Sequence, residues 1–505
     1  VILAKTIKGY GMGEAGEAQN ITHQQKKMGT TSLKAFRNRF GLEIPDDKID
    51  EVPYLTLAKD SPEFTYMQER RKALVGTFHR RKTSAQALQI PPLSAFEALL
   101  KASGEGHESS TTMAFVRILN VLVKDKQIGR HIVPIVADES RTFGMEGMFR
   151  QLGIWSSVGQ LYTPQDADQL MYYKEDKHGQ ILQEGINEAG AMSSWIAAAT
   201  AYSTHGVQMI PFFIFYSMFG FQRIGDLAWA AGDMRCRGFL LGGTAGRTTL
   251  NGEGLQHEDG HSHVVASTIP NCISYDPAFA YELAVIIQDG LRRMYQEQED
   301  IYYYITVMNE NYSHPEMPAG AEKDILKGMY LFSEGSISSS EPHVQLLGAG
   351  TILREVIAAA GILKTEYNVN ADIWSVTSFN ELRREALSVV RWNMLHPDQP
   401  AKVSHVENCF KGREGPVVAS TDYMKIYADQ IREFIPGKYR VLGTDGFGRS
   451  DTREKLRRFF EVDRFYITVA TLKALAEEGK IPNQQVVQAI QKYGIDPEKP
   501  NPVTV

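Results

Sequence analysis

The length, composition and charge of this chain are those of an ordinary globular protein. It has 505 residues, 43% of them hydrophobic, which is enough for two or three domains with cores of their own. The formal net charge of −6 argues against nucleic-acid binding, and two short basic clusters, at residues 70–72 and 80–82, are typical of solvated faces. We therefore expect no nucleic-acid partner.

Cysteine content and hydropathy bear on the compartment. The three cysteines, Cys236, Cys272 and Cys409, are odd in number and lack metal-site spacing, so we expect free thiols in a reducing, cytoplasmic environment. The longest apolar run, residues 209–221, is too short for a membrane span and contains Pro211. We expect it to form a buried strand and its exit, and we expect no membrane partner.

The first residues alternate in the manner of a strand. Residues 1–7 read Val-Ile-Leu-Ala-Lys-Thr-Ile, with neither an initiator methionine nor the layout of a signal peptide. We expect a strand that pairs with an upstream region, and hence that the sequence is the downstream part of a longer polypeptide. The glycine-rich residues 8–20 that follow should be mobile.

Helical and strand patterns alternate through the middle of the chain. Residues 30–100 combine short helical patterns with several prolines, and residues 103–112 are linker-like. Beyond them we expect strands at 132–137, 181–186, 209–216, 238–242 and 301–308, and helices at 113–123, 187–203, 224–234 and 277–295. Such alternation is typical of an α/β domain with a parallel sheet.

A second α/β unit begins after Pro315 and Pro318. Its expected strands are at 344–347, 373–376 and 416–419, and its expected helices at 351–364, 450–460 and 463–478. Two glycine-rich turns, at residues 348–353 and 443–448, lack the third glycine or the lysine of a nucleotide-binding loop, so we interpret both as structural.

The most informative segment is residues 251–263, which holds three of the thirteen histidines and three carboxylates among several glycines. Such a segment suggests proton transfer or ligand capture. Three other positions, 138–139, 184–188 and 216–219, place carboxylates or aromatics where expected strands end. Because ligands of parallel sheets bind outside the carboxyl ends of strands, these positions could line one pocket. The alternative is that the acids are solvated or cap helices.

His257 and His261 stand in the order His-Glu-Asp-Gly-His, which matches the zinc-protease signature H-E-x-x-H. That signature works on a helix, whereas Gly260 lies inside the motif here, and an interior glycine costs a helix about 1 kcal/mol. Glu282, a possible third ligand, lies in an apolar helical run and is expected to be a solvated helix residue. A zinc-dependent hydrolase that uses both histidines is the alternative enzyme class.

Six segments of the sequence carry a resemblance to a known family. They are residues 4–11, 137–147, 183–188, 216–226, 251–263 and 443–450. The family is that of the homodimeric bacterial pyruvate dehydrogenases, the thiamin-diphosphate-dependent decarboxylating components of the pyruvate dehydrogenase complex. The similarity runs essentially from end to end.

The resemblance implies an α/β, transketolase-like thiamin-diphosphate-binding fold of open, mostly parallel sheets with helices on both faces. It divides the chain into the end of a diphosphate-binding domain with its connector (1–88), an aminopyrimidine-binding domain (89–317) and a C-terminal domain (318–505). The family's magnesium and diphosphate motif is not found in this sequence, so thiamin diphosphate and Mg²⁺ are the implied cofactors but no metal ligand is expected in this chain. The implied partners are a second subunit, pyruvate, and the lipoyl domain and core of dihydrolipoamide acetyltransferase.

The resemblance also implies which residues bind the cofactor. Glu188 would hydrogen-bond the aminopyrimidine ring and promote its reactive tautomer. Phe219 would stack on that ring, and Ile186 would line the same pocket. Asp138 and Glu139 match acidic residues near the ring, where burial should raise the affinity of a carboxyl for its proton. Glu188 and Glu139 are thus catalytic candidates.

Substrate and acetyl transfer involve other residues of the resemblance. His257, Tyr216 and Lys8 would meet the carboxylate and oxygen of pyruvate as donors or proton shuttles. His23 matches the histidine of an inner loop that assists acetyl transfer to lipoamide, which yields CO₂ and acetyl-dihydrolipoamide. The remaining non-enzymatic alternative is that the chain alone is a catalytically inactive binding module.

Overall fold

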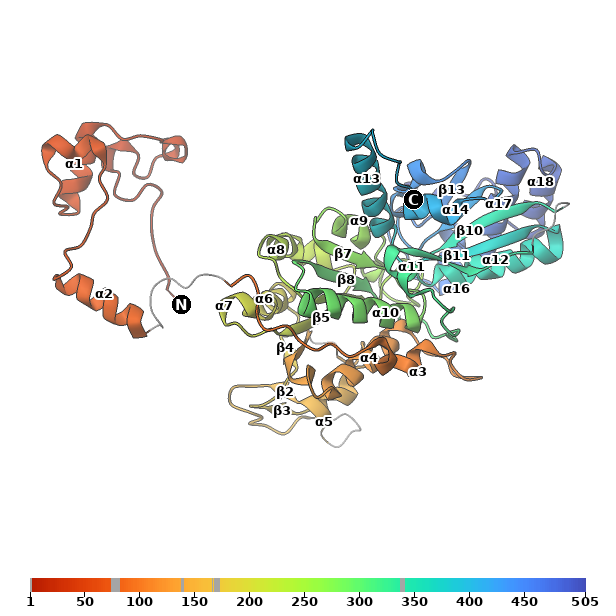
Figure 1. The fold of residues 1–505 in the computed structure, drawn as a ribbon, viewed down its shortest axis with the longest axis horizontal. Helices are drawn as coiled ribbons and strands as arrows, with labels where there is room; N and C mark the ends of the chain where they lie inside the picture. Colours follow the sequence, from red (N-terminus) through yellow and green to blue (C-terminus); the bar gives the residue numbers. More distant parts are fainter. Residues whose placement is uncertain (1, 74–81, 138–139, 166, 168–172, 337–340) are drawn as a thin grey trace. The chain divides into compact units, whose positions relative to one another are not determined.

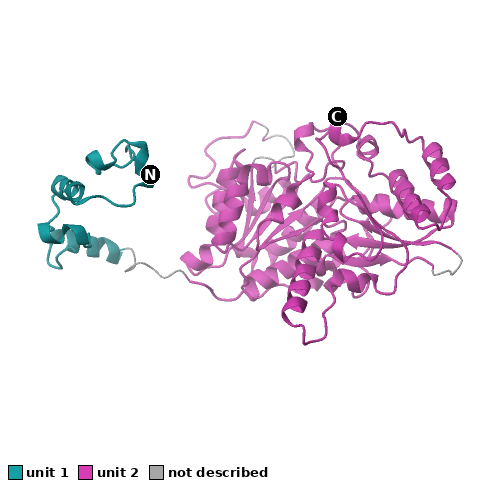
Figure 2. Cartoon of the chain, turned by 90° about the horizontal axis from the view of Figure 1, so that it is seen from above, with its two compact units in different colours: residues 1–81 teal, residues 82–505 magenta. Residues whose placement is uncertain are grey.

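The computed structural model describes residues 2–73, 82–137, 140–165, 167, 173–336 and 341–505. The chain divides into two compact units, residues 1–81 and residues 82–505, which Figure 2 shows in different colours. Both large sheets belong to the second unit.

The described part of the first unit is helical and has little core. Its elements are η1 (Gly13–Ala15), η2 (Asn20–Gln24), α1 (Thr30–Arg39), η3 (Asp46–Glu51) and α2 (Pro62–Ala73). Among its described residues only Ile49 is a buried hydrophobic side chain, and polar contacts such as Arg39 with Glu17 (2.6 Å) hold it together. The described residues 2–7 form no strand, since no neighbouring strand in the described part of this unit supplies the ladder that an extended backbone needs, and their pairing with an upstream region stays a prediction.

Six parallel strands form the first sheet, in the order β4-β1-β5-β6-β8-β7. They are β1 (Ile132–Val136), β4 (Leu182–Gln183), β5 (Ile210–Tyr216), β6 (Phe239–Gly243), β7 (Cys272–Tyr275) and β8 (Tyr302–Thr306). Every residue of β1 and β6 is buried, which explains why these strands are continuous apolar runs. Between β1 and β4 in the sequence, β2 (Ile154–Trp155) and β3 (Glu175–Asp176) form a separate two-stranded parallel sheet.

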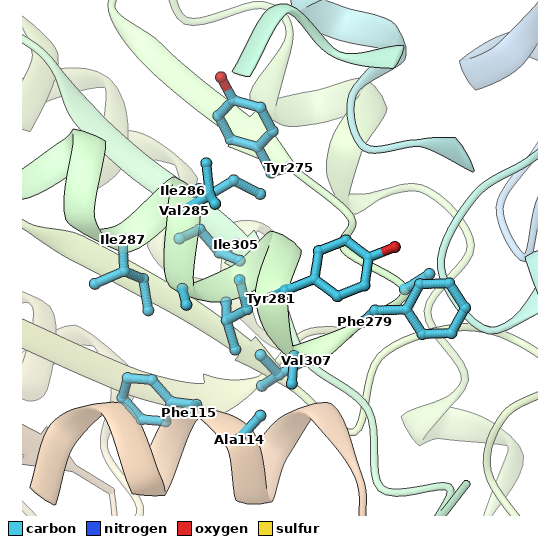
Figure 3. Packing of buried hydrophobic residues seen from close by; sticks show 14 of the residues in the cluster. Ala114, Phe115, Tyr275, Phe279, Tyr281, Val285, Ile286, Ile287, Ile305 and Val307 are labelled. Carbon is cyan, nitrogen blue, oxygen red and sulfur yellow. The ribbon is translucent and has the colours of Figure 1, made fainter. Parts of the chain in front are cut away.

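Helices cover both faces of this sheet because successive strand residues point to opposite sides. On one face Ile132 and Ile214 pack in a core with α4 (Thr111–Lys124) and α10 (Ala280–Leu291), where Figure 3 shows Phe115 among residues of α10 and β8. On the other face lie α6 (Glu188–Ala199) and α8 (Gly220–Asp233), with Ile135 and Phe213 beneath them.

Shorter elements connect these helices and strands. They are η4 (Leu93–Phe96), α3 (Glu97–Leu100), η5 (Gly129–His131), η6 (Glu146–Met148), α5 (Phe149–Leu152), α7 (Ala201–Thr204), η7 (Leu255–His257), α9 (Ser262–Ala266), η8 (Arg292–Gln296) and α11 (Glu322–Lys327).

The second sheet has five strands in the order β13-β12-β10-β11-β9, with β9 antiparallel at its edge. They are β9 (Met329–Ser333), β10 (His343–Gly348), β11 (Asn370–Val376), β12 (Val417–Ser420) and β13 (Tyr439–Leu442). Its helices and short turns are α12 (Ile352–Tyr367), α13 (Phe379–Leu395), α14 (His405–Phe410), α15 (Lys425–Asp429), η9 (Arg432–Phe434), α16 (Arg453–Phe459), α17 (Arg464–Glu477), α18 (Asn483–Lys492) and η10 (Pro502–Thr504). In Figure 1 both sheets carry helices on their faces, as expected for an open α/β fold.

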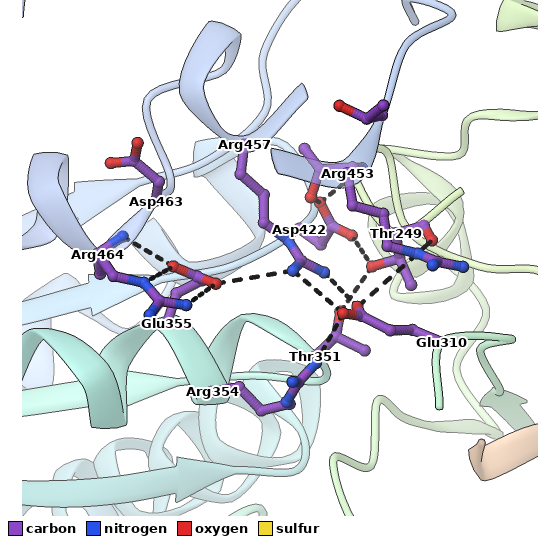
Figure 4. Close-up of polar contacts among 12 residues, drawn as sticks. Thr249, Glu310, Thr351, Arg354, Glu355, Asp422, Arg453, Arg457, Asp463 and Arg464 are labelled. Atoms are coloured by element: carbon purple, nitrogen blue, oxygen red, sulfur yellow. Dashed lines mark hydrogen bonds and ion pairs between the residues drawn. The ribbon is translucent and has the colours of Figure 1, made fainter. Parts of the chain in front are cut away.

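A buried polar network joins the two sheets (Figure 4). Glu310, which follows β8, accepts hydrogen bonds from Arg457 of α16 and from Arg354 of α12, the latter at 2.7 Å. Nearby, Thr249 donates to the buried Asp422 at 2.6 Å. Buried charged groups such as Arg457 and Asp422 need partners, and these partners come from elements of both sheets.

Glu282 is buried and is not the solvated helix residue expected from the sequence. Its carboxylate accepts hydrogen bonds from Tyr330 and Ser375 of the second sheet, each at 2.6 Å, and from the backbone N–H of Ala278 at 2.6 Å. Burial raises the pKa of this carboxyl. The apolar helical run around it correctly indicated a buried helix, and the error lay in treating a lone acid as exposed.

Candidate active site

The carboxyl ends of β4, β1, β5 and β6 lie side by side at one edge of the first sheet. The four strands are neighbours and run parallel, so Val136 and Tyr216 end adjacent strands. The chain beyond β4 stays at this edge, since the N–H of Glu184 donates to the carbonyl of Val136 at 3.0 Å. The strand-end positions noted in the sequence, where described, therefore share one edge, the usual ligand-binding edge of such a sheet.

Glu188 is the first residue of α6. The side chain of Asn187 caps this helix by accepting a hydrogen bond from the N–H of Gly190 at 3.0 Å. Glu188 is only 9% exposed, and its Oε1 accepts a hydrogen bond from Nη1 of Arg223 in the first turn of α8. Arg223 is its only hydrogen-bonding partner among the described residues, so the two packed helices fix this carboxylate and leave Oε2 for a ligand.

Tyr216, Phe219 and His257 form an aromatic cluster beside this pair. The imidazole of His257 lies 5.1 Å, centroid to centroid, from each of the other two rings. The guanidinium of Arg223 lies 4.2 Å from the centroid of the Phe219 ring, which connects the cluster to Glu188. Nδ1 of His257 is buried and has no hydrogen-bond partner among the described residues. Rings, a carboxylate and an unpaired buried nitrogen together are suited to binding a planar, polar ligand.

His257 and His261 do not share a helical face. His257 ends the 3-10 turn η7, and α9 begins only at Ser262. A Cβ on Gly260 would lie 2.4 Å from Cζ of Arg247, so a glycine is needed where the segment passes that side chain. The two histidines therefore lack the helical arrangement that the H-E-x-x-H signature needs. The residues between them form a loop, as the interior glycine predicted.

The other two histidines of the segment have different surroundings. His263 is fully buried, with Nε2 2.9 Å from Oγ1 of Thr306 and its ring stacked 4.9 Å from that of Tyr427. Burial lowers the pKa of His263 to about 3, so the ring is neutral. His261 is partly exposed, and its Nε2 lies 3.2 Å from Nε2 of Gln222. His263 thus has the packing of a structural residue.

The other predicted site residues have different surroundings or lie outside the described part of the chain. Ile186, on the connection from β4 to α6, is 70% exposed. Lys8 and His23 are exposed residues of the first unit, Lys8 before η1 and His23 within η2. Asp138 and Glu139 lie outside the described residues.

Sequence reasoning missed Arg223. A local signal existed, because Arg223 follows Phe219 by four residues on a helix, and residues at that spacing are neighbours. Its bond to Glu188, 35 residues away, depends on the packing of α6 against α8 and has no sequence signal.

Comparisons with known proteins identify the families that this chain resembles. The family model described as "Pyruvate dehydrogenase E1 component middle domain" matches residues 88–315, and "Transketolase-like TK C-terminal domain" matches residues 328–463. The pyruvate dehydrogenase E1 component of Cupriavidus necator is 66% identical over all of this chain, and that of Escherichia coli K12 is 57% identical over 99% of it. Along its whole length this chain is therefore similar to pyruvate dehydrogenase E1 components. It spans about 56% of the length of either relative.

Solved structures extend the comparison to the fold alone. The transketolase of Campylobacter jejuni aligns with 92% of this chain and 61% of its own, with a TM-score of 0.58 and 16% identity. The transketolase of Leishmania mexicana aligns with 91% of this chain and 57% of its own, with a TM-score of 0.54 and 15% identity. The chain thus has a transketolase-like fold, as expected.

The described residues contain neither a cluster of metal ligands nor a membrane-spanning helix. No three His, Cys, Asp or Glu side chains in this part of the chain come together as a metal site. No described helix combines the length and apolar character needed to cross a membrane.

Proposed function

We propose that this chain forms the aminopyrimidine-binding side of the active site of a thiamin-diphosphate-dependent pyruvate dehydrogenase. The observation that carries the proposal is the joining of Glu188 to the cluster of Tyr216, Phe219 and His257, through Arg223, at the carboxyl edge of the first sheet. When bound, thiamin diphosphate supplies a nucleophilic carbon and an electron sink for loss of CO₂ from pyruvate.

The described residues fit the aminopyrimidine end of this cofactor. Oε2 of Glu188 can accept a hydrogen bond from the ring, and the half-buried Phe219 offers an aromatic surface. Ile186 exposes an apolar side chain on the same β4–α6 connection. We assign Asp138 and Glu139 to the same end from the family resemblance. From the same resemblance, whose magnesium and diphosphate motif is not found in this sequence, we assign the diphosphate and Mg²⁺ to residues outside this chain.

His257 is the group best placed to act on pyruvate. In the tautomer that carries its proton there, the unpaired Nδ1 can donate a hydrogen bond to a carboxylate or keto oxygen, and Tyr216 lies beside it. Lys8, from the family resemblance, would bind the carboxylate of pyruvate. His23, on the same basis, would assist transfer of the acetyl group to the lipoyl domain of dihydrolipoamide acetyltransferase.

The wider arrangement is also part of the proposal. We propose a homodimer, the division 1–88, 89–317 and 318–505, and a cytoplasmic location. The bounds of the two family matches and of the two sheets support the second and third divisions. The free state of Cys236, Cys272 and Cys409 supports a reducing compartment.

The first experiment tests cofactor dependence in a completed protein, meaning residues 1–505 joined to the part of the Cupriavidus necator relative that lies outside the match. We expect pyruvate decarboxylation that disappears when thiamin diphosphate is removed and returns when it is added back. Glu188→Gln should lose about 100-fold or more, because an amide cannot provide the charge-assisted bond to the ring. Glu97→Gln, at an exposed i,i+4 pair, is the control and should act like the parent. Decarboxylation that persists undiminished without the cofactor contradicts the proposal.

Titration of the chain by itself separates the enzyme from a mere binding module. We expect residues 1–505 alone to bind thiamin diphosphate much more weakly than the completed protein. The diphosphate carries most of the charge of the cofactor, and we assign its binding residues to the part outside this chain. Equal affinity would show that the whole cofactor site lies in this chain. Stoichiometric, tightly bound zinc in the purified chain would instead revive the hydrolase alternative.

A further inference from the structure

The loop at residues 443–451, which links β13 to α16, lies along the histidine segment (residues 251–263) of the other sheet's domain. The N–H of Gly252 donates to the carbonyl of Asp451 at 3.0 Å. A Cβ on Gly448 would lie 2.5 Å from the carbonyl oxygen of Leu255, so only a glycine permits this approach. The two backbones therefore meet at the start of the segment and again next to His257.

Arg247 connects the loop to the far end of the segment. Its side chain is 5% exposed, and its Nη1 donates to the carbonyl oxygens of Thr444, at 2.7 Å, and of Gly446. The same guanidinium lies against Gly260. No ion pair within the described residues involves Arg247. The hydrogen bonds of this buried guanidinium go to backbone carbonyls. Burying a charge in this way is costly, which indicates that it serves to hold these backbones in place.

Glu258 anchors the segment directly beside the proposed catalytic imidazole. Its side chain is 1% exposed and turns toward the loop, where Oε2 accepts a hydrogen bond from the N–H of Arg449 at 2.7 Å. His257 and Glu258 share a peptide bond, so fixing one side chain against the loop limits how the other can move.

We propose that Arg247 and Glu258 are positioning residues through which the loop at 443–451 holds His257 against Tyr216 and Phe219. The C-terminal domain is then a structural part of the active site. The effect on catalysis rests on the proposed function, whereas the hold on the histidine segment does not.

Hydrogen exchange of the chain without cofactor tests the hold by itself. In Arg247→Met we expect exchange to rise at least about tenfold in both 251–263 and 443–451, because the loop loses the donor to its two carbonyls and the segment loses the guanidinium that lies against Gly260. The control is Arg237→Met, an equally buried arginine of the first sheet that pairs with Asp300 at 2.9 Å. Equal exchange of the histidine segment in the two variants overturns the proposal. If the Met variant does not fold, Arg247→Lys takes its place in the same exchange measurement. Lysine keeps the charge, but its single ammonium cannot reach both carbonyls and Gly260.

Kinetics of the completed protein test the consequence. Glu258→Ala should lower kcat for decarboxylation by roughly 10- to 100-fold, the range expected when a catalytic group is displaced by about 1 Å. Glu258→Gln should recover most of it, because the amide oxygen still accepts from Arg449. Glu282→Ala removes another buried carboxylate and is the control. It should lower the melting temperature but change kcat little. An equal loss of kcat in the Ala and Gln variants contradicts the positioning role. A parent protein without any decarboxylation would instead overturn the proposed function and leave the exchange result intact.

Discussion

His257 and His23 differ in surroundings and should fail differently when replaced. His257 is packed against Tyr216 and Phe219, whereas His23 is an exposed residue of a 3-10 turn in the first unit. For His23→Ala in the completed protein, we expect decarboxylation with an artificial electron acceptor to survive within about threefold, while acetyl transfer to lipoamide falls about 100-fold or more. His257→Ala should lower both rates. Equal losses in both assays for His23→Ala would assign that histidine to the first chemical step.

Glu258 should make the stability of the fold depend on pH. Burial raises the pKa of this carboxyl to about 8, against 4.5 for an ordinary glutamate, and the N–H of Arg449 opposes that shift. The unfolded chain therefore releases this proton near pH 4.5, while the folded chain keeps it until about pH 8. The contribution of Glu258 to stability is complete below pH 4.5 and falls as the pH rises to about 8.

Glu258→Gln mimics the protonated form and isolates this effect. Between pH 5 and pH 8 we expect the free energy of unfolding of the parent to fall relative to that of Glu258→Gln, measured by denaturation at several pH values. Above pH 8 the difference should become constant. A difference that does not change with pH would mean that Glu258 is already ionised in the folded protein.

The sequence could indicate single residues where chemistry concentrates but not what each contacts. The density of histidines and acids at 251–263 led to His257, and the resemblance led to Glu188 and Phe219. Nothing local predicted that Arg223 would bind Glu188, because that contact arises from the packing of two helices. Glu282 shows the same limit, since its partners come from a different sheet.

Among the elements, the histidine segment depends on a glycine. A Cβ on Gly260 would collide with the guanidinium of Arg247, at 2.4 Å from Cζ and from Nη2, and Arg247 is held by two carbonyls. We expect Gly260→Ala to destabilise the chain by about 1–3 kcal/mol, measured by thermal or urea denaturation. Gly361→Ala is the matched control, because Gly361 lies within α12 with open space where a Cβ would be. Alanine there should stabilise by about 0.5–1 kcal/mol, and the same sign at both positions would contradict the argument.

The buried strands and helices of the first sheet largely followed from the sequence, whereas α13 (Phe379–Leu395), the longest helix of the described structure, was not predicted. The strand at 210–216 and the helix at 111–124 were evident from apolar runs and helical spacing. The edge strands β9 and β13 were missed because short segments at a sheet edge have little pattern of their own. Residues 2–7 show the converse, an alternating pattern that forms no strand in the described structure.

At the scale of the whole molecule, alternation of helices and strands was enough to predict two open α/β sheets. It was not enough to predict how they are joined. The junction contains Glu310, Glu355 and Asp422 with Arg457 and other arginines of the C-terminal helices. These charges are separated by long stretches of sequence, so their pairing follows only from the completed fold.

Arg457 should be the most important cation of this junction. It donates to Glu310, lies 3.7 Å from Glu355, and is almost completely buried, so its loss leaves two buried carboxylates with one arginine fewer. We expect Arg457→Met to cost about 3–5 kcal/mol in the free energy of unfolding, as when one partner of a buried ion pair is removed. Arg354 also donates to Glu310, at 2.7 Å, but its side chain is 37% exposed. Arg354→Met should therefore cost only about 0–1 kcal/mol, because water can replace it. Denaturation followed by hydrogen exchange in each sheet measures both effects, and an equal cost for the two variants would show that burial does not set the strength of this junction.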